Sequence, residues 1–252
     1  MVNYNRDVAV FPVLRRIFEK ISGGKSMYQS PTDMGVNRAG FGIVDDAAVC
    51  EASRQEILRR YFRYACEYAM GLTENETVQR VERLLQALNL RPEDRRVVEP
   101  ARRAALAGKG NMGICCGAAV ELQDGAMITG KNSPLLHAAS SLILNAIKHL
   151  AGIPDKIHLL SPNVTASIGT LKRDILNGKT ESLSLDETLV ALSISSTTNP
   201  SAQLAMEKLK ELAGCEMHLT HIPTSGDAAG LKRLGVNLTS DPQFPTRNLC
   251  FS

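Results

Sequence analysis

The sequence predicts an α/β protein in which a helical amino-terminal region is followed by a three-layer α/β/α domain with a mixed sheet. Two observations carry this prediction. Up to about Ala107, apolar residues recur at the three-and-four spacing of amphipathic helices, whereas from Gly108 onward short apolar runs alternate with helical segments. The chain has 252 residues, 44% of them apolar, which is enough to bury a core. We expect the helical region to span 1–110 and the α/β/α domain 111–252.

A long polar loop divides the helical region. Loops of this length inside a compact region are uncommon and are often functional or in contact with a partner. We therefore expect residues 22–45 to have a function or to contact a partner surface. The capping box Thr73-x-x-Glu76 predicts one helix start. The helices predicted in this region run from Val10 to Ile21, from Asp45 or Asp46 to Met70, from Thr73 to Leu90 and from Pro92 to Ala107.

The second region begins with a predicted hairpin, which makes the sheet mixed. Asp124-Gly125 separates two strands that form the hairpin. Further along the chain, strands alternate with helices, which is typical of a sheet that helices cover on both faces. Residues 184–196 fit a buried strand or a helix, and the capping box Ser184-x-x-Glu187 favours the helix. The predicted strands are 114–122, 126–129, 157–160, 216–222 and 236–238, and the helices are 133–150, 161–178, 184–196, 199–213 and 226–234.

Composition limits the class of protein and its compartment. No run approaches the roughly 18 apolar residues that a membrane-spanning helix needs, and the first seven residues contain no apolar signal core. Six cysteines occur without a C-x-x-C pair, which fits a reducing compartment. A net charge of +3 is too small to indicate nucleic acid. We therefore expect a cytoplasmic protein without membrane or nucleic-acid partners.

Familiar nucleotide and hydrolase motifs are absent. A P-loop needs a glycine five residues before its Gly-Lys pair, but Glu19 precedes Gly24-Lys25 and Arg173 precedes Gly178-Lys179 at that distance. The sequence has no G-x-S-x-G and no H-E-x-x-H, and its five histidines form no metal-ligand spacing. No metal site is expected, and no cofactor is indicated.

Proline-initiated helices provide the candidate ligand site. A capping residue followed by proline occurs at Ser133-Pro134, Ser161-Pro162 and Asn199-Pro200, and the free N–H groups of a helix start favour an anion. Ordinary capping is the alternative explanation. The candidate anion-binding residues are Lys131 and Ser133 at the first start, and Thr198 and Asn199 at the third.

The long loop provides further candidates. Its polar groups are not needed to complete a helix or a sheet, so Asp33 is a candidate acid or base and Asn37 and Arg38 are candidate ligand-binding residues. Loops also use Asp and Asn for purely conformational reasons, and that alternative stays open.

Several segments together resemble a known bacterial family. They are Tyr4-Asn5-Arg6-Asp7, the loop from Ser30 to Gly42, Thr129-Gly130-Lys131-x-Ser133, and the run from Ala191 to Pro200. On these residues the chain resembles the carboxyl-terminal half of the domain-of-unknown-function family numbered 1846, also called uncharacterised protein family 0371. The resemblance implies a protein of about twice this length, a missing amino-terminal half as partner, and one site shared by the loop, Lys131 and Asn199. Some members carry the label ATP-dependent peptidase.

Three functions follow as hypotheses. The first is half of an enzyme that binds a small anionic or phosphorylated metabolite in an interdomain cleft, since ligand sites prefer such clefts. The second is a non-catalytic interaction module whose residues 30–42 pack against another protein surface. The third is the peptidase that the family label suggests. A homo-oligomer is also expected, and the residues do not specify the reaction or the substrate.

Overall fold

The computed structural model describes residues 46–108, 110–178 and 180–245, together with residues 17, 21 and 23. The chain divides into two compact units, Met1–Arg95 and Arg96–Ser252. Except for those three residues, the predicted helix of 10–21 and the predicted loop of 22–45 lie outside the described residues.

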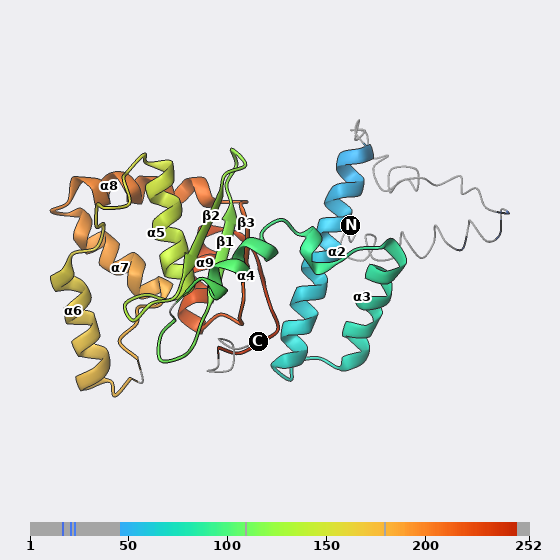
Figure 1. The fold of residues 1–252 in the computed structure, drawn as a ribbon, viewed down its shortest axis with the longest axis horizontal. Helices are drawn as coiled ribbons and strands as arrows, with labels where there is room; N and C mark the ends of the chain where they lie inside the picture. The colour runs from blue at the N-terminus through green and yellow to red at the C-terminus, as the bar shows by residue number, and fades with distance from the viewer. Residues whose placement is uncertain are drawn as a thin grey trace. The chain divides into compact units, whose positions relative to one another are not determined.

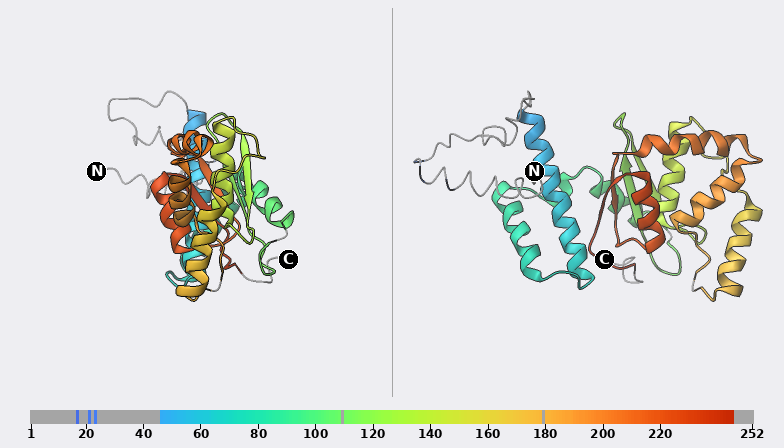
Figure 2. Two further views of the ribbon diagram at one scale, coloured as in Figure 1. Left: turned by 90° about the vertical axis from the view of Figure 1, so that its left-hand side faces the viewer. Right: turned by 180° about the vertical axis from the view of Figure 1, so that it is seen from behind.

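The first unit contains a pair of helices, as the sequence predicted. Helices α2 (Asp46–Ala69) and α3 (Asn75–Leu88) pack side by side (Figures 1 and 2). Their shared core consists of Ile57, Leu58, Val81, Leu85 and Leu90. The predicted capping box at Thr73 is wrong, because α3 begins after Glu74 and no side chain caps it. A short 3-10 helix, η1 (Pro92–Asp94), closes this unit.

The second unit is built on a four-stranded mixed sheet, which confirms the predicted fold class. The sheet order is β2-β1-β3-β4, and β1 runs antiparallel to both neighbours while β3 and β4 are parallel. The strands are β1 (Gly117–Glu121), β2 (Met127–Lys131), β3 (Glu216–Leu219) and β4 (Asn237–Ser240).

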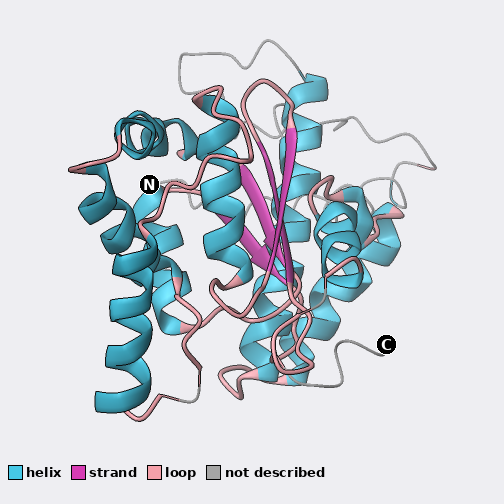
Figure 3. Ribbon diagram, turned by 60° about the vertical axis from the view of Figure 1, so that its left-hand side comes forward, coloured by secondary structure: helices cyan, strands magenta, loops and turns pink. Residues whose placement is uncertain are grey.

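Helices cover both faces of this sheet and give the predicted three layers (Figures 1 and 3). Helix α4 (Val98–Leu106) packs on one face, and α5 (Ala138–Leu150) packs on the other. Glycines permit both contacts. A Cβ on Gly117 would lie 2.1 Å from the carbonyl oxygen of Ala101 in α4, and one on Gly130 would lie 2.3 Å from the amide nitrogen of Leu142 in α5. The single helix predicted from Pro92 to Ala107 is thus two pieces, η1 and α4.

The remaining helices lie beyond or beside α5. Residues 185–196 are helical and begin with the capping box of Ser184 and Glu187, which confirms the favoured alternative. The helices are α6 (Pro162–Thr170), which continues as the π-helix η2 (Leu171–Ile175), then α7 (Leu185–Ser196), α8 (Pro200–Glu207), the 3-10 helix η3 (Lys208–Leu212) and α9 (Ser225–Leu234). Among the described residues, no helix combines the length and apolar character that crossing a membrane requires.

Two further predicted elements differ in the structure. Residues 157–160 form no strand. Leu159 is buried in the main core, so this apolar run reflects burial without strand pairing. Helix α5 begins at Ala138 and not at Ser133-Pro134. The hydroxyl of Ser133 accepts the N–H of Leu136 at 3.1 Å, and Leu136 then pairs with Leu183 in a parallel bridge, which keeps the chain extended up to the helix.

Candidate functional site

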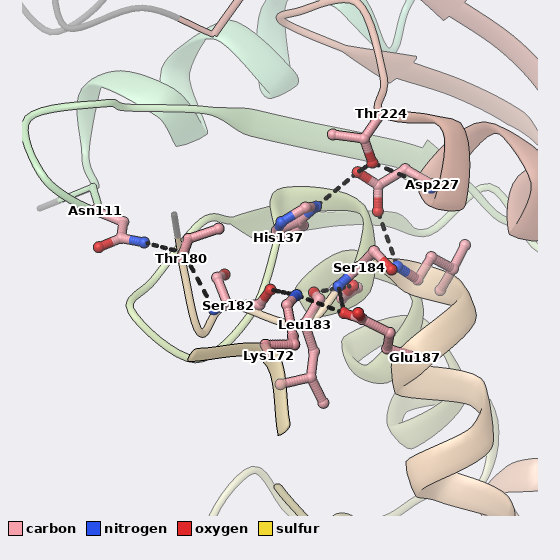
Figure 4. A network of polar contacts seen from close by, with 12 residues as sticks. Asn111, His137, Lys172, Thr180, Ser182, Leu183, Ser184, Glu187, Thr224 and Asp227 are labelled. Carbon is pink, nitrogen blue, oxygen red and sulfur yellow. Dashed lines mark hydrogen bonds and ion pairs between the residues drawn. The ribbon is translucent and has the colours of Figure 1, made fainter. Parts of the chain in front are cut away.

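Three helix starts meet at one buried carboxylate, Asp227. This residue lies in the first turn of α9, where the backbone N–H of Asp227 donates to the hydroxyl of the N-cap residue Thr224 at 3.3 Å. Its Oδ1 accepts the N–H of Leu185, the first residue of α7, at 2.8 Å. Its Oδ2 accepts the hydroxyl of Thr224 at 2.7 Å and lies 2.8 Å from Nδ1 of His137, the N-cap residue of α5 (Figure 4). One side chain therefore links the starts of α5, α7 and α9.

The segment before α7 is held against this site by further hydrogen bonds. Leu183 bridges to the chain before α5, because its N–H donates to Leu135 and its carbonyl accepts the N–H of His137 at 3.0 Å. Nζ of Lys172, in η2, donates to the carbonyl of Ser182 at 2.6 Å and contacts Glu187 at 2.7 Å (Figure 4). These contacts fix the backbone that faces His137.

Asp227 is ionised and His137 is oriented by it. Burial raises the pKa of Asp227, but the hydrogen bond and charge of His137 and the hydroxyl of Thr224 outweigh burial, so its pKa lies below the ordinary value. An ionised carboxylate accepts hydrogen bonds only, so Nδ1 of His137 donates. In its neutral form the ring carries its lone pair on Nε2, on the side of the ring away from Asp227. In Figure 4 the ring nitrogen not bonded to Asp227 points toward the side of Thr180 and Ser182.

The imidazole of His137 opens into a cavity of about 290 Å³, which we call the histidine cavity. The side chain of His137 is 21% exposed. Apolar groups such as Ile114 and Ala138 form part of the wall, and none of the described lining residues carries a permanent charge. The polar lining residues are Asn111, Asn132, His137, Thr180, Ser182, His221 and Thr224.

A second histidine, His221, lines the same cavity and is almost wholly buried, with 5% of its surface exposed. Its Nδ1 is enclosed and has no hydrogen-bond partner. Burial lowers the pKa of His221 to about 4, against the smaller opposing effect of Asp227, so the ring is neutral at pH 7. A buried nitrogen without a partner is uncommon in folded proteins and invites an explanation.

Thiolate chemistry is excluded at Cys116, which also lines the cavity. Burial, with a contribution from the charge of Asp227, raises the pKa of the Cys116 thiol to about 12. A protonated buried thiol is a poor nucleophile and a poor metal ligand. Over the part of the chain that the structure describes, no group of three His, Cys, Asp or Glu side chains could hold a metal ion. The chemistry available here is proton transfer by His137, with Asp227 stabilising the imidazolium.

The anion-binding residues predicted at the first helix start lie outside the lining of this cavity. Lys131, the last residue of β2, directs its ammonium to the carbonyl of Ala107 at 3.4 Å. The hydroxyl of Ser133 accepts the backbone N–H groups of Leu135 and Leu136. Its carbonyl accepts the hydroxyl of Ser182, a lining residue, at 3.2 Å. Ser133 therefore supports the wall of the histidine cavity without contributing its own side chain to it.

The predicted residues at the third helix start contact a different part of the unit. Asn199 caps α8 as predicted, because its Oδ1 accepts the N–H groups of Ser201 and Ala202. Its amide nitrogen donates to the carbonyl of His158 at 3.0 Å. His158 lines a second cavity of about 350 Å³ beside α5 and α6. Thr198, which is exposed, lines neither cavity.

Asp33, Asn37 and Arg38 lie outside the described residues, so their predicted roles stay predictions. Sequence reasoning missed the residues that do share a cavity. His137 and Asp227 are 90 positions apart, and neither belongs to a local catalytic motif. The only signal was that Asp227 stands near the start of the predicted helix 226–234, a feature that ordinary capping also explains, whereas His137 lies inside the predicted helix 133–150.

Comparisons with known proteins identify the family. Residues 1–89 match the model described as domain of unknown function DUF1846, N-terminal, and residues 93–250 match domain of unknown function DUF1846, C-terminal. The chain is 50% identical over 254 residues to a UPF0371 protein of Clostridium botulinum (strain Alaska E43 / Type E3). It is 48% identical over 254 residues to a UPF0371 protein of Clostridioides difficile (strain 630). Each alignment covers 100% of this chain and 51% of the relative, so the chain spans about half the length of the curated relatives it matches.

These matches correct one prediction. The chain was expected to be a carboxyl-terminal half whose partner is a missing amino-terminal half. Because residues 1–89 match the N-terminal model, the chain carries sequence from both family domains, and both the expectation and the expected partner are wrong.

Proposed function

Since the chain belongs to the family of the domain of unknown function DUF1846, we propose a function from its site: an enzyme that acts on a small polar metabolite by general acid–base chemistry at His137. The observation that carries the proposal is the 2.8 Å contact between Nδ1 of His137 and the buried carboxylate of Asp227 at the wall of the histidine cavity. A histidine oriented by a carboxylate is a common general base in enzymes.

The roles follow from the contacts. Nε2 of His137 accepts a proton from a hydroxyl or an acidic C–H of the substrate and later returns it. Asp227 holds the ring in the required tautomer and stabilises its charged form. Thr224 and Leu185 hold Asp227 in place through its two oxygens. A cavity of about 290 Å³ matches a small metabolite and not a polypeptide.

Two elements of the earlier hypotheses are separate from this proposal. An anionic or phosphorylated ligand at Lys131 and Ser133, or at Thr198 and Asn199, is a separate proposal. Loss of phosphate-ester binding in Lys131→Ala would support the first of these two sites. The interaction-module hypothesis depends on residues 30–42, which lie outside the described residues.

The test compares metabolite consumption by variants of the 252-residue chain. Wild-type protein and His137→Gln are incubated with a small-molecule cell extract, and mass spectrometry follows each compound. We expect wild type to deplete a specific metabolite and His137→Gln to do so about 10²-fold to 10⁴-fold more slowly, the usual contribution of general acid–base catalysis.

His149→Gln is the matched control. His149 lies near the end of α5, half-exposed and outside the histidine cavity, with Asp124 at 3.9 Å. It is expected to keep the wild-type rate, and circular dichroism checks that both variants are folded. Depletion that is equal in wild type and His137→Gln, or no depletion by wild type, contradicts the proposal.

A further inference from the structure

Lys172, in the π-helix η2, holds the loop at one wall of the histidine cavity at both of its ends. Its ammonium donates to the carbonyl of Ser182 at 2.6 Å, and its own carbonyl accepts the N–H of Gly178 at 2.7 Å (Figure 4). Thr180 and Ser182, which line the cavity, belong to the stretch that these two contacts fasten. Lys172 is not one of the described lining residues, so it acts on the cavity through this loop.

The local backbone explains how one residue reaches both ends of the loop. In η2 the N–H of Leu176 donates to the carbonyl of Leu171, five residues back, and such π turns are frequent at functional sites. Asn177 then takes a left-handed conformation, with a φ of 51°, and turns the chain back at the helix end. The N–H of Gly178 thereby meets the carbonyl of Lys172, and a Cβ on this glycine would lie 3.0 Å from that oxygen.

The ammonium of Lys172 also acts on the start of α7. It contacts Oε2 of Glu187 at 2.7 Å, and the same oxygen accepts the N–H of Ser184 at 2.8 Å. The next residue, Leu185, donates its N–H to Oδ1 of Asp227. Hydrogen bonds between ionised groups are about twice as strong as neutral ones. The ammonium therefore fixes the carboxylate that fixes the start of α7.

This ion pair is partly withdrawn from water. The side chain of Lys172 is 15% exposed and that of Glu187 is 33% exposed. A partly buried pair is screened by salt less than a surface pair. Removing the ammonium leaves the carboxylate of Glu187 and the carbonyl of Ser182 without their charged partner, which costs more than the loss of an exposed contact.

The neighbouring Arg173 provides a comparison. Its side chain is 53% exposed, and its guanidinium contacts Asp174 and Glu181, whose side chains are about half-exposed. Exposed ion pairs of this kind contribute little to stability. Arg173 therefore carries the same charge on the same turn and contacts the same loop, but it donates neither to the backbone of Ser182 nor to the start of α7.

We propose that Lys172 is a positioning residue for the general base. By holding residues 178–182 and the start of α7, its ammonium keeps His137 and Asp227 in the geometry that proton transfer needs. One route runs through Ser182 to Leu183, whose carbonyl accepts the N–H of His137 at 3.0 Å. The other runs through the start of α7 to Asp227. This inference rests on the proposed function, because it concerns the geometry of the same site.

The first test needs no substrate. NMR of protein labelled with ¹⁵N in its histidines reports which ring nitrogen carries the proton, and amide exchange reports how firmly each hydrogen bond is closed. Lys172→Met keeps the length of the side chain and removes the ammonium. We expect the neutral ring of His137 to change from one tautomer, protonated at Nδ1, to a mixture of two. We expect the amides of His137 and Leu185 to exchange about tenfold to a hundredfold faster.

Two variants separate positioning from a general loss of stability. Lys172→Arg keeps a cation with N–H donors and is expected to restore the single tautomer. Arg173→Met removes the exposed charge next to it and is expected to match wild type in tautomer and exchange. The amide of Ala119 in β1 reports on the sheet and should be unchanged in all three variants. A wild-type result for Lys172→Met, or the same changes in Arg173→Met, overturns the proposal.

A variant of the other partner carries the test if Lys172→Met does not fold. Glu187→Gln keeps an acceptor for the N–H of Ser184 and loses the negative charge that the ammonium contacts. We expect it to raise the exchange rate of the Leu185 amide by a smaller factor than Lys172→Met. Exchange at the wild-type rate in Glu187→Gln overturns the proposal.

The metabolite-depletion assay shows which of the two proposals fails. Lys172→Met is expected to slow depletion about 10-fold to 10²-fold, since small displacements of a catalytic group have effects of this size. Depletion that requires His137 and is equal in Lys172→Met and wild type overturns the role of Lys172 and leaves the proposed function standing. The NMR changes at His137 without depletion by wild type support the positioning of the ring and contradict the enzyme.

Discussion

His221 links the site to the pH dependence of stability. Its pKa is lowered by burial from the ordinary 6.5 to about 4 in the folded chain. The unfolded chain therefore binds a proton between pH 6.5 and 4 that the folded chain does not, and stability falls as the pH falls through this window. Above pH 6.5 both states are neutral at this residue, and His221 then adds no pH dependence.

We expect wild-type protein to lose up to about 3 kcal/mol of unfolding free energy through His221 between pH 6.5 and 4. Urea unfolding at a series of pH values measures it. His221→Phe should remove this part of the slope, whereas His149→Gln should keep it. Asp241 titrates at lower pH, because its pKa is about 2. Burial raises this pKa, but the hydrogen bonds and charges of His218 and Arg102 lower it by more. Identical slopes in wild type and His221→Phe would show that His221 is accessible to protons when folded.

At the scale of elements, glycines set how closely helices approach the sheet. Gly130 of β2 lies under α5, and a Cβ there would meet the backbone nitrogen of Leu142 at 2.3 Å. Neither group can move without separating the helix from the strand. The same holds at Gly117 and α4 on the opposite face.

Gly130→Ala is expected to destabilise the second unit by about 3 kcal/mol through overpacking, measured by urea unfolding at pH 7. Gly169→Ala is the matched control. In α6 its Cβ would have no neighbour closer than the 3.4 Å to Glu181, so it should be neutral or stabilise by up to about 1 kcal/mol. Equal stability of Gly130→Ala and wild type would mean that α5 shifts freely on the sheet.

The elements that local chemistry specifies are those that sequence reasoning found. The capping box of Ser184 and Glu187 starts α7, and the hairpin turn at Asp124-Gly125 joins β1 and β2. Residues 157–160 were mistaken for a strand, because an apolar run indicates burial and does not say whether the backbone has a pairing partner.

The site was harder to predict because its parts are far apart in sequence. The helix-start argument pointed to Ser133 and Asn199, while the carboxylate that joins three helix starts is Asp227. Nothing local distinguishes Thr224-x-x-Asp227 from an ordinary cap. The contact depends on tertiary packing that no window of sequence reports.

At the scale of the whole molecule, the second unit has its own core and contains every described lining residue of the histidine cavity. We therefore expect residues 96–252 alone to unfold in one cooperative urea transition and to show well-dispersed amide signals in NMR spectra. A fragment with poorly dispersed amide signals, or one that unfolds without a cooperative transition, would contradict this expectation.

The convergence on Asp227 also bears on how activity is acquired during folding. His137, Leu185 and Asp227 come from three segments that are brought together only when α5, α7 and α9 have docked. A partly folded intermediate that lacks any of these helices has no oriented base. Under the proposed function, turnover in refolding experiments should therefore return only after the last of these three helices has docked, and chains in which any of them is unfolded should be inactive.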